Sequence, residues 1–193
     1  MGRPLCREKL APLSAFLFLL CSCTEPERRA VETVRPAEGR KAFLVVADQP
    51  LAAACGMEVL RRGGNAADAA VAVSFALAVV RPEDCGLGAG GFALVLVPNQ
   101  QPVVLDFREQ APERLRRQDF LDRQGDPISE RSKIGALAVG VPGQVLGAVT
   151  LWQRFGSGRM ALAELLRPAI RLAEEGFPVD RHLHRAMVRL AET

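Results

Sequence analysis

Residues 63–80 read GGNAADAAVAVSFALAVV, and this stretch decides the centre of the fold. Asn65 is a strong helix N-cap residue, and the residues after it, up to Val80, are nearly all small or apolar. A helix that is apolar on every side is buried on most of them, and small side chains let neighbouring elements pack closely. A residue before proline avoids the helical conformation, so Arg81-Pro82 ends the helix. The sequence therefore predicts a buried central helix over residues 66–80.

Shorter signals on both sides of this helix predict further elements. Pro50 suits a first helical turn and Gly63-Gly64 suits a helix end, which predicts a preceding helix between them. The other expected elements are a buried strand at 43–47 (FLVVA), a hairpin of strands at 92–97 and 103–107, and helices at about 144–155, 161–175 (with Pro168 inside it) and 181–191. Strands and helices mixed in this way indicate a layered α/β or α+β fold.

The composition is that of a globular domain. The chain has 193 residues, of which 49% are hydrophobic, and this excludes a disordered or collagenous protein. Its 25 basic and 22 acidic residues nearly balance, so the charge does not favour nucleic-acid binding. Five cysteines are too few for a disulfide scaffold. Cys55 and Cys85 lie in the expected domain, and the sequence leaves open whether they pair or remain buried thiols.

The first 23 residues are typical of an export signal. A basic start precedes the apolar run at 10–20, which is shorter than the roughly 20 residues that span a bilayer. Leu20-Cys21-Ser22-Cys23 resembles a bacterial lipobox in which Cys23 takes the lipid, and an ordinary cleaved signal peptide is the alternative. We therefore predict a lipoprotein-type signal peptide at 1–22, a tether at 23–41 and a domain at 42–193. The expected location is exported, either periplasmic or membrane-anchored through the lipid.

A glycine-rich loop follows the central helix. Gly86-Leu87-Gly88-Ala89-Gly90-Gly91 satisfies G-x-G-x-x-G, and Asp106 lies where a dinucleotide site would have an acidic residue. That site needs the order strand, loop, helix, because the pyrophosphate binds at a helix N-terminus. Here a helix precedes the loop and a strand follows it, so a dinucleotide site is disfavoured and we expect no cofactor. A tight packed turn and a close approach to a ligand both remain open explanations for the glycines.

Other candidate residues are few. We interpret His182 and His184, an H-x-H pair, as surface residues of a helix, and we expect no metal site. No G-x-S-x-G motif occurs and no histidine is placed to activate Cys85, so a serine or cysteine triad has no support. Arg108 directly follows a predicted strand, where its guanidinium could hold a carboxylate bidentately. The residues alone favour a structural ion pair between Arg108 and Asp106 or Glu109.

Five motifs occur in a fixed order along the chain. They are QPLAAACG through GGNAADAAV (49–71), CGLGAGGF (85–92), LDFREQAP (105–112), LAVGVPG (137–143) and PAIRLAEEGFP (168–178). Together they resemble the γ-glutamyltranspeptidase family (γ-glutamyltransferase, glutathione hydrolase) of N-terminal nucleophile hydrolases. Ala89 stands where that family usually has glycine.

The resemblance implies an α+β fold, a four-layer αββα sandwich that is only partly present in this chain. It implies a precursor that cleaves itself into a large and a small subunit. The new N-terminal threonine would attack the γ-glutamyl carbonyl of glutathione or a related compound, with its own α-amine as the base. The group would then pass to water, an amino acid or a peptide. The resemblance also implies that Arg108 binds the α-carboxylate of the γ-glutamyl group.

One family motif has no counterpart. The nucleophile segment Thr-Thr-His-x-Ser does not occur in these 193 residues. We therefore expect the N-terminal part of a large subunit, without the threonine nucleophile and inactive alone, whose partner is the missing C-terminal part with the small subunit. The alternative is a non-catalytic lipoprotein that binds γ-glutamyl compounds or amino acids around Arg108.

Overall fold

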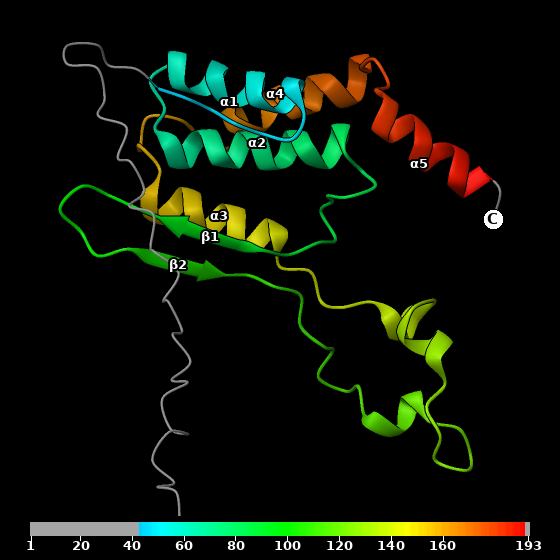
Figure 1. Cartoon of the computed structure of the whole chain (residues 1–193). Helices are drawn as coiled ribbons and strands as arrows, with labels where there is room; N and C mark the ends of the chain where they lie inside the picture. Colours follow the sequence, from blue (N-terminus) through cyan, green and yellow to red (C-terminus); the bar gives the residue numbers. More distant parts are fainter. Residues whose placement is uncertain (1–42, 192–193) are drawn as a thin grey trace, which may run out of the picture. The chain divides into compact units, whose positions relative to one another are not determined.

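The computed structural model describes residues 43–191, in which helices surround a central helix beside a small antiparallel sheet (Figure 1). The predicted signal peptide, tether and Cys23 lie outside the described residues. The helices are α1 (Pro50–Arg61), α2 (Ala66–Val80), α3 (Gln144–Phe155), α4 (Leu162–Glu175) and α5 (Arg181–Ala191); the strands are β1 (Phe92–Val95) and β2 (Val103–Asp106); three short 3₁₀ helices are η1 (Arg117–Phe120), η2 (Ser129–Ser132) and η3 (Ala136–Ala138). This arrangement is a mixed α and β fold with helices predominating.

The predicted central helix is confirmed with its predicted bounds. Asn65 Oδ1 accepts a hydrogen bond from the Asp68 N–H at 3.0 Å, and Asp68 Oδ2 accepts one from the Asn65 N–H at 2.9 Å. This reciprocal pair is a capping box, which satisfies N–H groups that a helix N-terminus leaves free. The helix contacts α1, α3 and α4. Figure 1 shows α2 between α1 and α4 on one side and α3 with the hairpin on the other.

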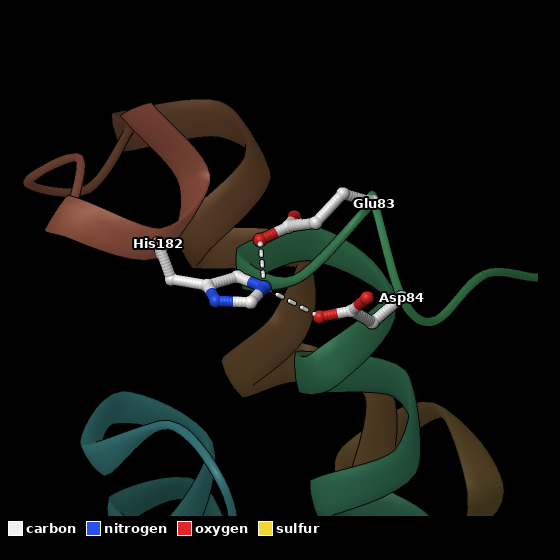
Figure 2. A group of neighbouring side chains, drawn as sticks. All are labelled: Glu83, Asp84 and His182. Atoms are coloured by element: carbon white, nitrogen blue, oxygen red, sulfur yellow. Dashed lines mark hydrogen bonds and ion pairs between the residues drawn. The ribbon is translucent and has the colours of Figure 1, made fainter. Parts of the chain in front are cut away.

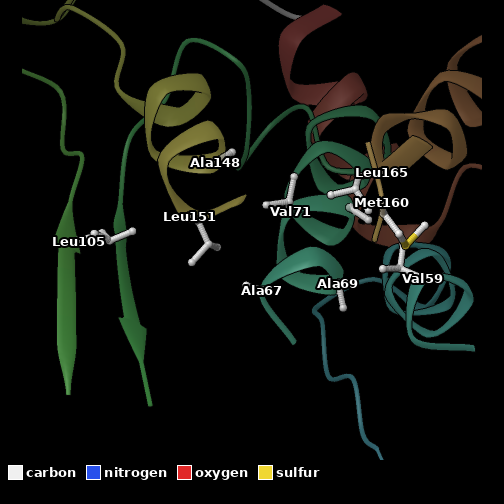
Figure 3. Close-up of a cluster of buried hydrophobic side chains, with 10 residues drawn as sticks. Val59, Ala67, Ala69, Val71, Leu105, Ala148, Leu151, Met160 and Leu165 are labelled. Atoms are coloured by element: carbon white, nitrogen blue, oxygen red, sulfur yellow. The ribbon is translucent and has the colours of Figure 1, made fainter. Parts of the chain in front are cut away.

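The hydrophobic core runs through this stack of helices. One cluster extends from Val59 of α1 and Leu165 of α4, across Val71 of α2, to Leu151 of α3 and Leu105 of β2 (Figure 3). A second cluster lies between α1, α2 and α4 and consists of Ala52, Cys55, Ala76, Val80 and Ala169. Its many alanines keep the three helices close together, as the small residues of the central helix predict.

The predicted hairpin is also confirmed, with shorter strands. β1 and β2 pair antiparallel, with Phe92 opposite Asp106 and Val95 opposite Val103. Side chains alternate across the sheet, so Leu105 packs into the core while Leu94 and Val104 are exposed on the other face. The pairing continues beyond the strands, because the Phe107 N–H donates to the Gly91 carbonyl at 3.0 Å. The hairpin therefore joins the glycine loop to the segment that holds Arg108.

The predicted strand at residues 43–47 is wrong. This segment has no regular secondary structure, and Leu44 and Val46 are 83% and 81% exposed. An apolar, β-branched run forms a strand only where a neighbouring strand accepts its backbone hydrogen bonds. Within residues 43–191 the two-stranded sheet is formed by β1 and β2. The segment 43–47 therefore has the composition of a strand, but no neighbouring strand in this part of the chain pairs with it.

The remaining helix predictions are confirmed to within one residue. α3 and α5 have their predicted bounds, and α4 begins at Leu162 with Pro168 buried inside it. α1 begins at Pro50, and Gly63 has a φ of +92°, a conformation that favours glycine, just after the helix. None of the helices in the described residues combines the length and apolar character needed to cross a bilayer.

Candidate functional site

Three of the sequence motifs meet around Phe107. The glycine loop pairs with it through Gly91, whose N–H donates to the Phe107 carbonyl at 3.3 Å. Gly143, which ends the motif at 137–143, and Gly147 of α3 both pack against Phe107, because a Cβ at either position would overlap Phe107 atoms. The Ala89 carbonyl accepts hydrogen bonds from the N–H groups of Gly143 at 3.1 Å and Gln144 at 2.9 Å. The motifs are thus one packed unit that holds residues 105–110 in place.

The glycines of the loop serve packing in this unit. A Cβ at Gly90 would lie 2.5 Å from the Phe107 carbonyl oxygen and 2.7 Å from the Glu109 backbone nitrogen. The loop lies between α2 and β1, and its Ala89 carbonyl occupies the N-terminus of α3. The order required for a dinucleotide site is therefore absent from the described residues, as the sequence predicts. Close packing of backbone against backbone is therefore observed at Gly90, whereas a Cβ at Gly88 would have no atom of the described residues within 4 Å, so the approach of a ligand stays open as an explanation there.

Arg108 projects from the end of this unit. Its N–H donates to Asp106 Oδ1 at 3.0 Å, which fixes the backbone as it leaves β2. The Arg108 side chain is 57% exposed, and its Nη2 lies 3.4 Å from Glu109 Oε2. The predicted ion pair with Glu109 is therefore present, whereas Asp106 holds the backbone of Arg108 and not its side chain.

A cavity of about 330 Å³ lies beside Arg108, between the end of β2 and the start of α3. Its polar lining residues are Asp106, Arg108, Gln110 and Thr150, and Pro142, Gly143 and Leu146 close another side. An exposed guanidinium at such a cavity can hold a carboxylate through two parallel hydrogen bonds. Its pairing with Glu109 is weak enough to exchange, because a half-exposed ion pair contributes little stability.

A larger cavity of about 900 Å³ is mainly apolar and does not include Arg108. It lies between residues 43–46, α2, the glycine loop and α3, and it contains the hydrogen bond that Gln144 Nε2 donates to Ser74 Oγ. Of the residues that the structure describes, Asp84 is the one charged residue that lines this cavity, so its walls mainly fit packing partners or apolar ligands and supply little for acyl-transfer chemistry. We therefore locate the candidate site at the smaller cavity, because Arg108 lines it.

Cys55 and Cys85 are both free thiols in the structure, so the pairing left open by the sequence is not observed. Cys55 is buried in α1, and burial raises the pKa of its thiol. Burial also raises the pKa of Cys85, with a further contribution from the neighbouring Asp84 carboxylate. A raised pKa lowers the thiolate fraction at neutral pH, so neither cysteine has the character of a nucleophile.

One cluster of polar side chains was missed by the sequence reasoning. His182 Nε2 lies 2.8 Å from Asp84 Oδ2 and 3.5 Å from Glu83 Oε1 (Figure 2). His182 is an exposed residue of a helix, as interpreted, but it has two acidic partners that the sequence did not reveal. The partners come from the turn after α2, about a hundred residues away in sequence, where Pro82-Glu83-Asp84 gives no local signal of the contact. His184, the other member of the pair, is exposed.

Asp180 fixes the helix that carries His182. Its Oδ1 accepts hydrogen bonds from the N–H groups of His182 at 2.9 Å and Leu183 at 3.0 Å, at the start of α5. The Leu183 hydrogen bond, together with the nearby Arg81, holds the pKa of the Asp180 carboxyl below its ordinary value. The carboxylate therefore stays ionised at the helix N-terminus, where negative charge is stabilising.

The glycine loop that caps α3, the Asp-Phe-Arg-Glu segment and the Pro-Gly start of α3 are packed as one unit. They are three of the five ordered motifs by which the sequence resembles the N-terminal nucleophile hydrolases named above. The family described as Gamma-glutamyltranspeptidase matches residues 52–193. The chain belongs to the gamma-glutamyltranspeptidase family.

Individual relatives agree with this assignment. The chain is 42% identical to the glutathione hydrolase proenzyme of Escherichia coli over 140 residues, which are 72% of this chain and 24% of that protein. The crystal structure of Helicobacter pylori gamma-glutamyltranspeptidase superimposes with a TM-score of 0.75 and 41% identity, over 81% of this chain and 44% of that one. The chain thus spans about a quarter of the length of the curated relatives it matches.

A relative with a different name matches over the same region. The Acylase ACY 1 proenzyme of Pseudomonas sp. (strain SE83) is 39% identical over 155 residues, or 77% of this chain and 27% of that protein. The relatives that match this chain therefore carry two different names, glutathione hydrolase and acylase. Substrate identity has to be argued from Arg108 and its cavity.

Proposed function

We propose that this chain is the N-terminal part of a γ-glutamyltransferase. The enzyme transfers the γ-glutamyl group of glutathione and related γ-glutamyl compounds to water or to amino acid and peptide acceptors. The observation that carries the proposal is the exposed Arg108 side chain at the smaller cavity, held there by motifs of a gamma-glutamyltranspeptidase. An α-carboxylate is the group on a γ-glutamyl substrate that a guanidinium binds best.

Arg108 is the proposed substrate-binding residue. In the free chain its Nη2 pairs with Glu109, and the substrate α-carboxylate takes over this guanidinium when it binds. The backbone of Arg108 cannot move far during this exchange, because Asp106 holds its N–H and Phe107 is packed against glycines on two sides. The site is therefore preorganised, which lowers the entropic cost of binding.

Replacing Arg108 by alanine should weaken glutamate and glutathione binding roughly tenfold to a hundredfold. The expected loss follows from about 1.5–3 kcal/mol for hydrogen bonds between charged groups. Isothermal titration calorimetry of the whole chain measures the effect. The control is Arg114→Ala, which removes an exposed arginine from the same segment and should leave binding unchanged. Equal affinities for the wild type and Arg108→Ala would show that Arg108 does not bind the substrate.

The catalytic threonine is proposed to come from sequence other than these 193 residues, which contain no Thr-Thr-His-x-Ser segment. The partner in the complete enzyme would then be a C-terminal part with the small subunit, and the two together would build the four-layer αββα sandwich. The exposed Phe92, Leu94 and Val104 on the outer face of the hairpin fit such a partner layer.

The 193-residue chain alone should not hydrolyse γ-glutamyl-p-nitroanilide above a buffer blank, because it lacks the acyl-accepting nucleophile. Release of p-nitroaniline, followed by absorbance, measures the reaction. Turnover that survives purification to homogeneity would contradict the proposal. Calorimetric binding without turnover would support either the inactive part of an enzyme or the alternative, a non-catalytic lipoprotein that binds γ-glutamyl compounds.

The proposed location is outside the cytoplasm, with residues 1–22 as the signal peptide, 23–41 as a tether and 42–193 as the domain. Cys23 would carry the lipid in a bacterial lipoprotein, and simple signal cleavage is the alternative. The mass of the exported protein distinguishes the two, because acyl chains add mass to a mature protein that begins at Cys23.

A further inference from the structure

The cluster of Glu83, Asp84 and His182 is made from two segments that are distant in sequence. The carboxylates lie in the turn that follows α2, and the imidazole lies in the first turn of α5. One oxygen or nitrogen from each of the three side chains lies within 4.8 Å of the others. Figure 2 shows all three side chains pointing into the space between the turn and the helix.

Glu83 is the unusual member of the cluster. Its side chain is only 9% exposed, and neither Oε1 nor Oε2 accepts a hydrogen bond from any residue that the structure describes. Its basic neighbours are Arg81, with Nη1 at 3.6 Å, and His182, with Nε2 at 3.5 Å. Burying a carboxylate without hydrogen bonds is costly, so such a group calls for a ligand that satisfies it.

The surrounding charge favours a cation. Arg81 forms ion pairs with Asp48 at 3.0 Å, with Glu83 at 3.6 Å and with Asp180 at 3.8 Å. With Asp84, four carboxylates therefore meet one guanidinium and an imidazole. A single arginine does not neutralise them, and the excess negative charge attracts a further positive charge at the cluster.

We propose that Glu83, Asp84 and His182 bind a divalent transition-metal ion of the zinc class. Two carboxylate oxygens and one imidazole nitrogen are ligands that Zn²⁺ accepts, whereas Mg²⁺ and Ca²⁺ prefer oxygen ligands alone. Ligand atoms about 2.0 Å from a tetrahedral ion lie about 3.3 Å from one another. The observed separations from His182 Nε2, 2.8 Å and 3.5 Å, are close to this value and need only small side-chain shifts.

The cluster also provides access for the ion. Asp84 and His182 are about half exposed, so water reaches the site and supplies the fourth ligand. Asp180 fixes the start of α5 by accepting the His182 N–H, which holds the imidazole on the side of the turn. The three ligand residues are not among those that line the Arg108 cavity. The ion joins α5 to the turn that leads into the glycine loop.

Zinc titration of the metal-free full chain at pH 7.5, in competition with a chromogenic chelator, tests the proposal. We expect one ion per chain, and at least about tenfold weaker binding for His182→Gln and for Glu83→Gln. His184→Gln is the matched control, because it removes the other histidine of the same helix, and it should bind like the wild type. All these variants keep every cysteine, so any zinc that binds to thiolates contributes equally to each titration and does not affect the comparison. Circular dichroism shows whether each variant is folded. If Glu83→Gln does not fold, the comparison of His182→Gln with His184→Gln decides the test.

Thermal unfolding gives a second readout. Zinc should raise the unfolding midpoint of the wild type and of His184→Gln, but not that of His182→Gln, because an ion that binds only the folded site stabilises it. The proposal is overturned if the wild type binds no zinc saturably. It is also overturned if His182→Gln and His184→Gln weaken binding equally, since that result would indicate an adventitious H-x-H site.

Discussion

Replacing Asp68 by alanine should lower the free energy of unfolding by about 3 kcal/mol, a large fraction of what holds a small domain together. The Asp68 side chain is fully buried, and its Oδ2 accepts hydrogen bonds from the Asn65 N–H at 2.9 Å and the Ser157 N–H at 3.1 Å. Alanine leaves both donors unpaired inside the protein and removes a negative charge from the N-terminus of α2. The contact to Ser157 also joins α2 to the segment after α3, so both helices are affected.

Urea unfolding followed by circular dichroism measures this effect. The matched control is Asp122→Ala, because Asp122 also accepts two backbone hydrogen bonds, from Gln124 at 2.9 Å and Asp126 at 2.8 Å, but is exposed. Water replaces the lost acceptor there, so we expect a loss below about 1 kcal/mol. If both variants lose a similar free energy of unfolding, the burial of Asp68 does not increase the contribution of its hydrogen bonds to stability.

Replacing Gly143 by alanine should cost about 3 kcal/mol, because a methyl group there overlaps the Phe107 carbonyl. The backbone at Gly143 has φ −111° and ψ −15°, which alanine adopts without strain, so the effect reports packing alone. The atoms that this methyl group meets are the carbonyl groups of Phe107 and Arg108. They belong to the backbone, which cannot rotate away as a side chain can. The displaced segment carries Arg108, so glutamate binding should weaken together with stability.

Gly88→Ala is the control for this substitution. A Cβ at Gly88 has no atom of the described residues within 4 Å, and the residue lies in the glycine loop of the same packed unit. We expect a change near zero, or a gain of up to about 1 kcal/mol because alanine restricts the unfolded chain. Urea unfolding and glutamate calorimetry on both variants give the comparison. If the two alanines have equal effects, the packed unit around Phe107 does not depend on Gly143.

Much of the fold was predictable because its signals are local. Asn65 and the residues after it define α2, since N-cap hydrogen bonds and apolar content act within a few residues. The bounds of α3 and α5 follow from the same kind of signal. The strand at 43–47 could not be predicted correctly, because a strand depends on a partner elsewhere in the chain and composition does not reveal one.

The candidate sites divide in the same way. The ordered motifs identified the family and singled out Arg108, because the residues of a motif are neighbours in sequence. By itself the sequence determined the central helix, the hairpin and the family. Only the tertiary structure decided that the glycines pack against the Phe107 backbone, that Cys55 and Cys85 are free thiols, and that His182 meets Glu83 and Asp84. The physical reason is that these contacts join segments that are far apart in sequence and are brought together by the packing of α2 against α1, α3 and α4. No local pattern of residues predicts which distant segments will meet.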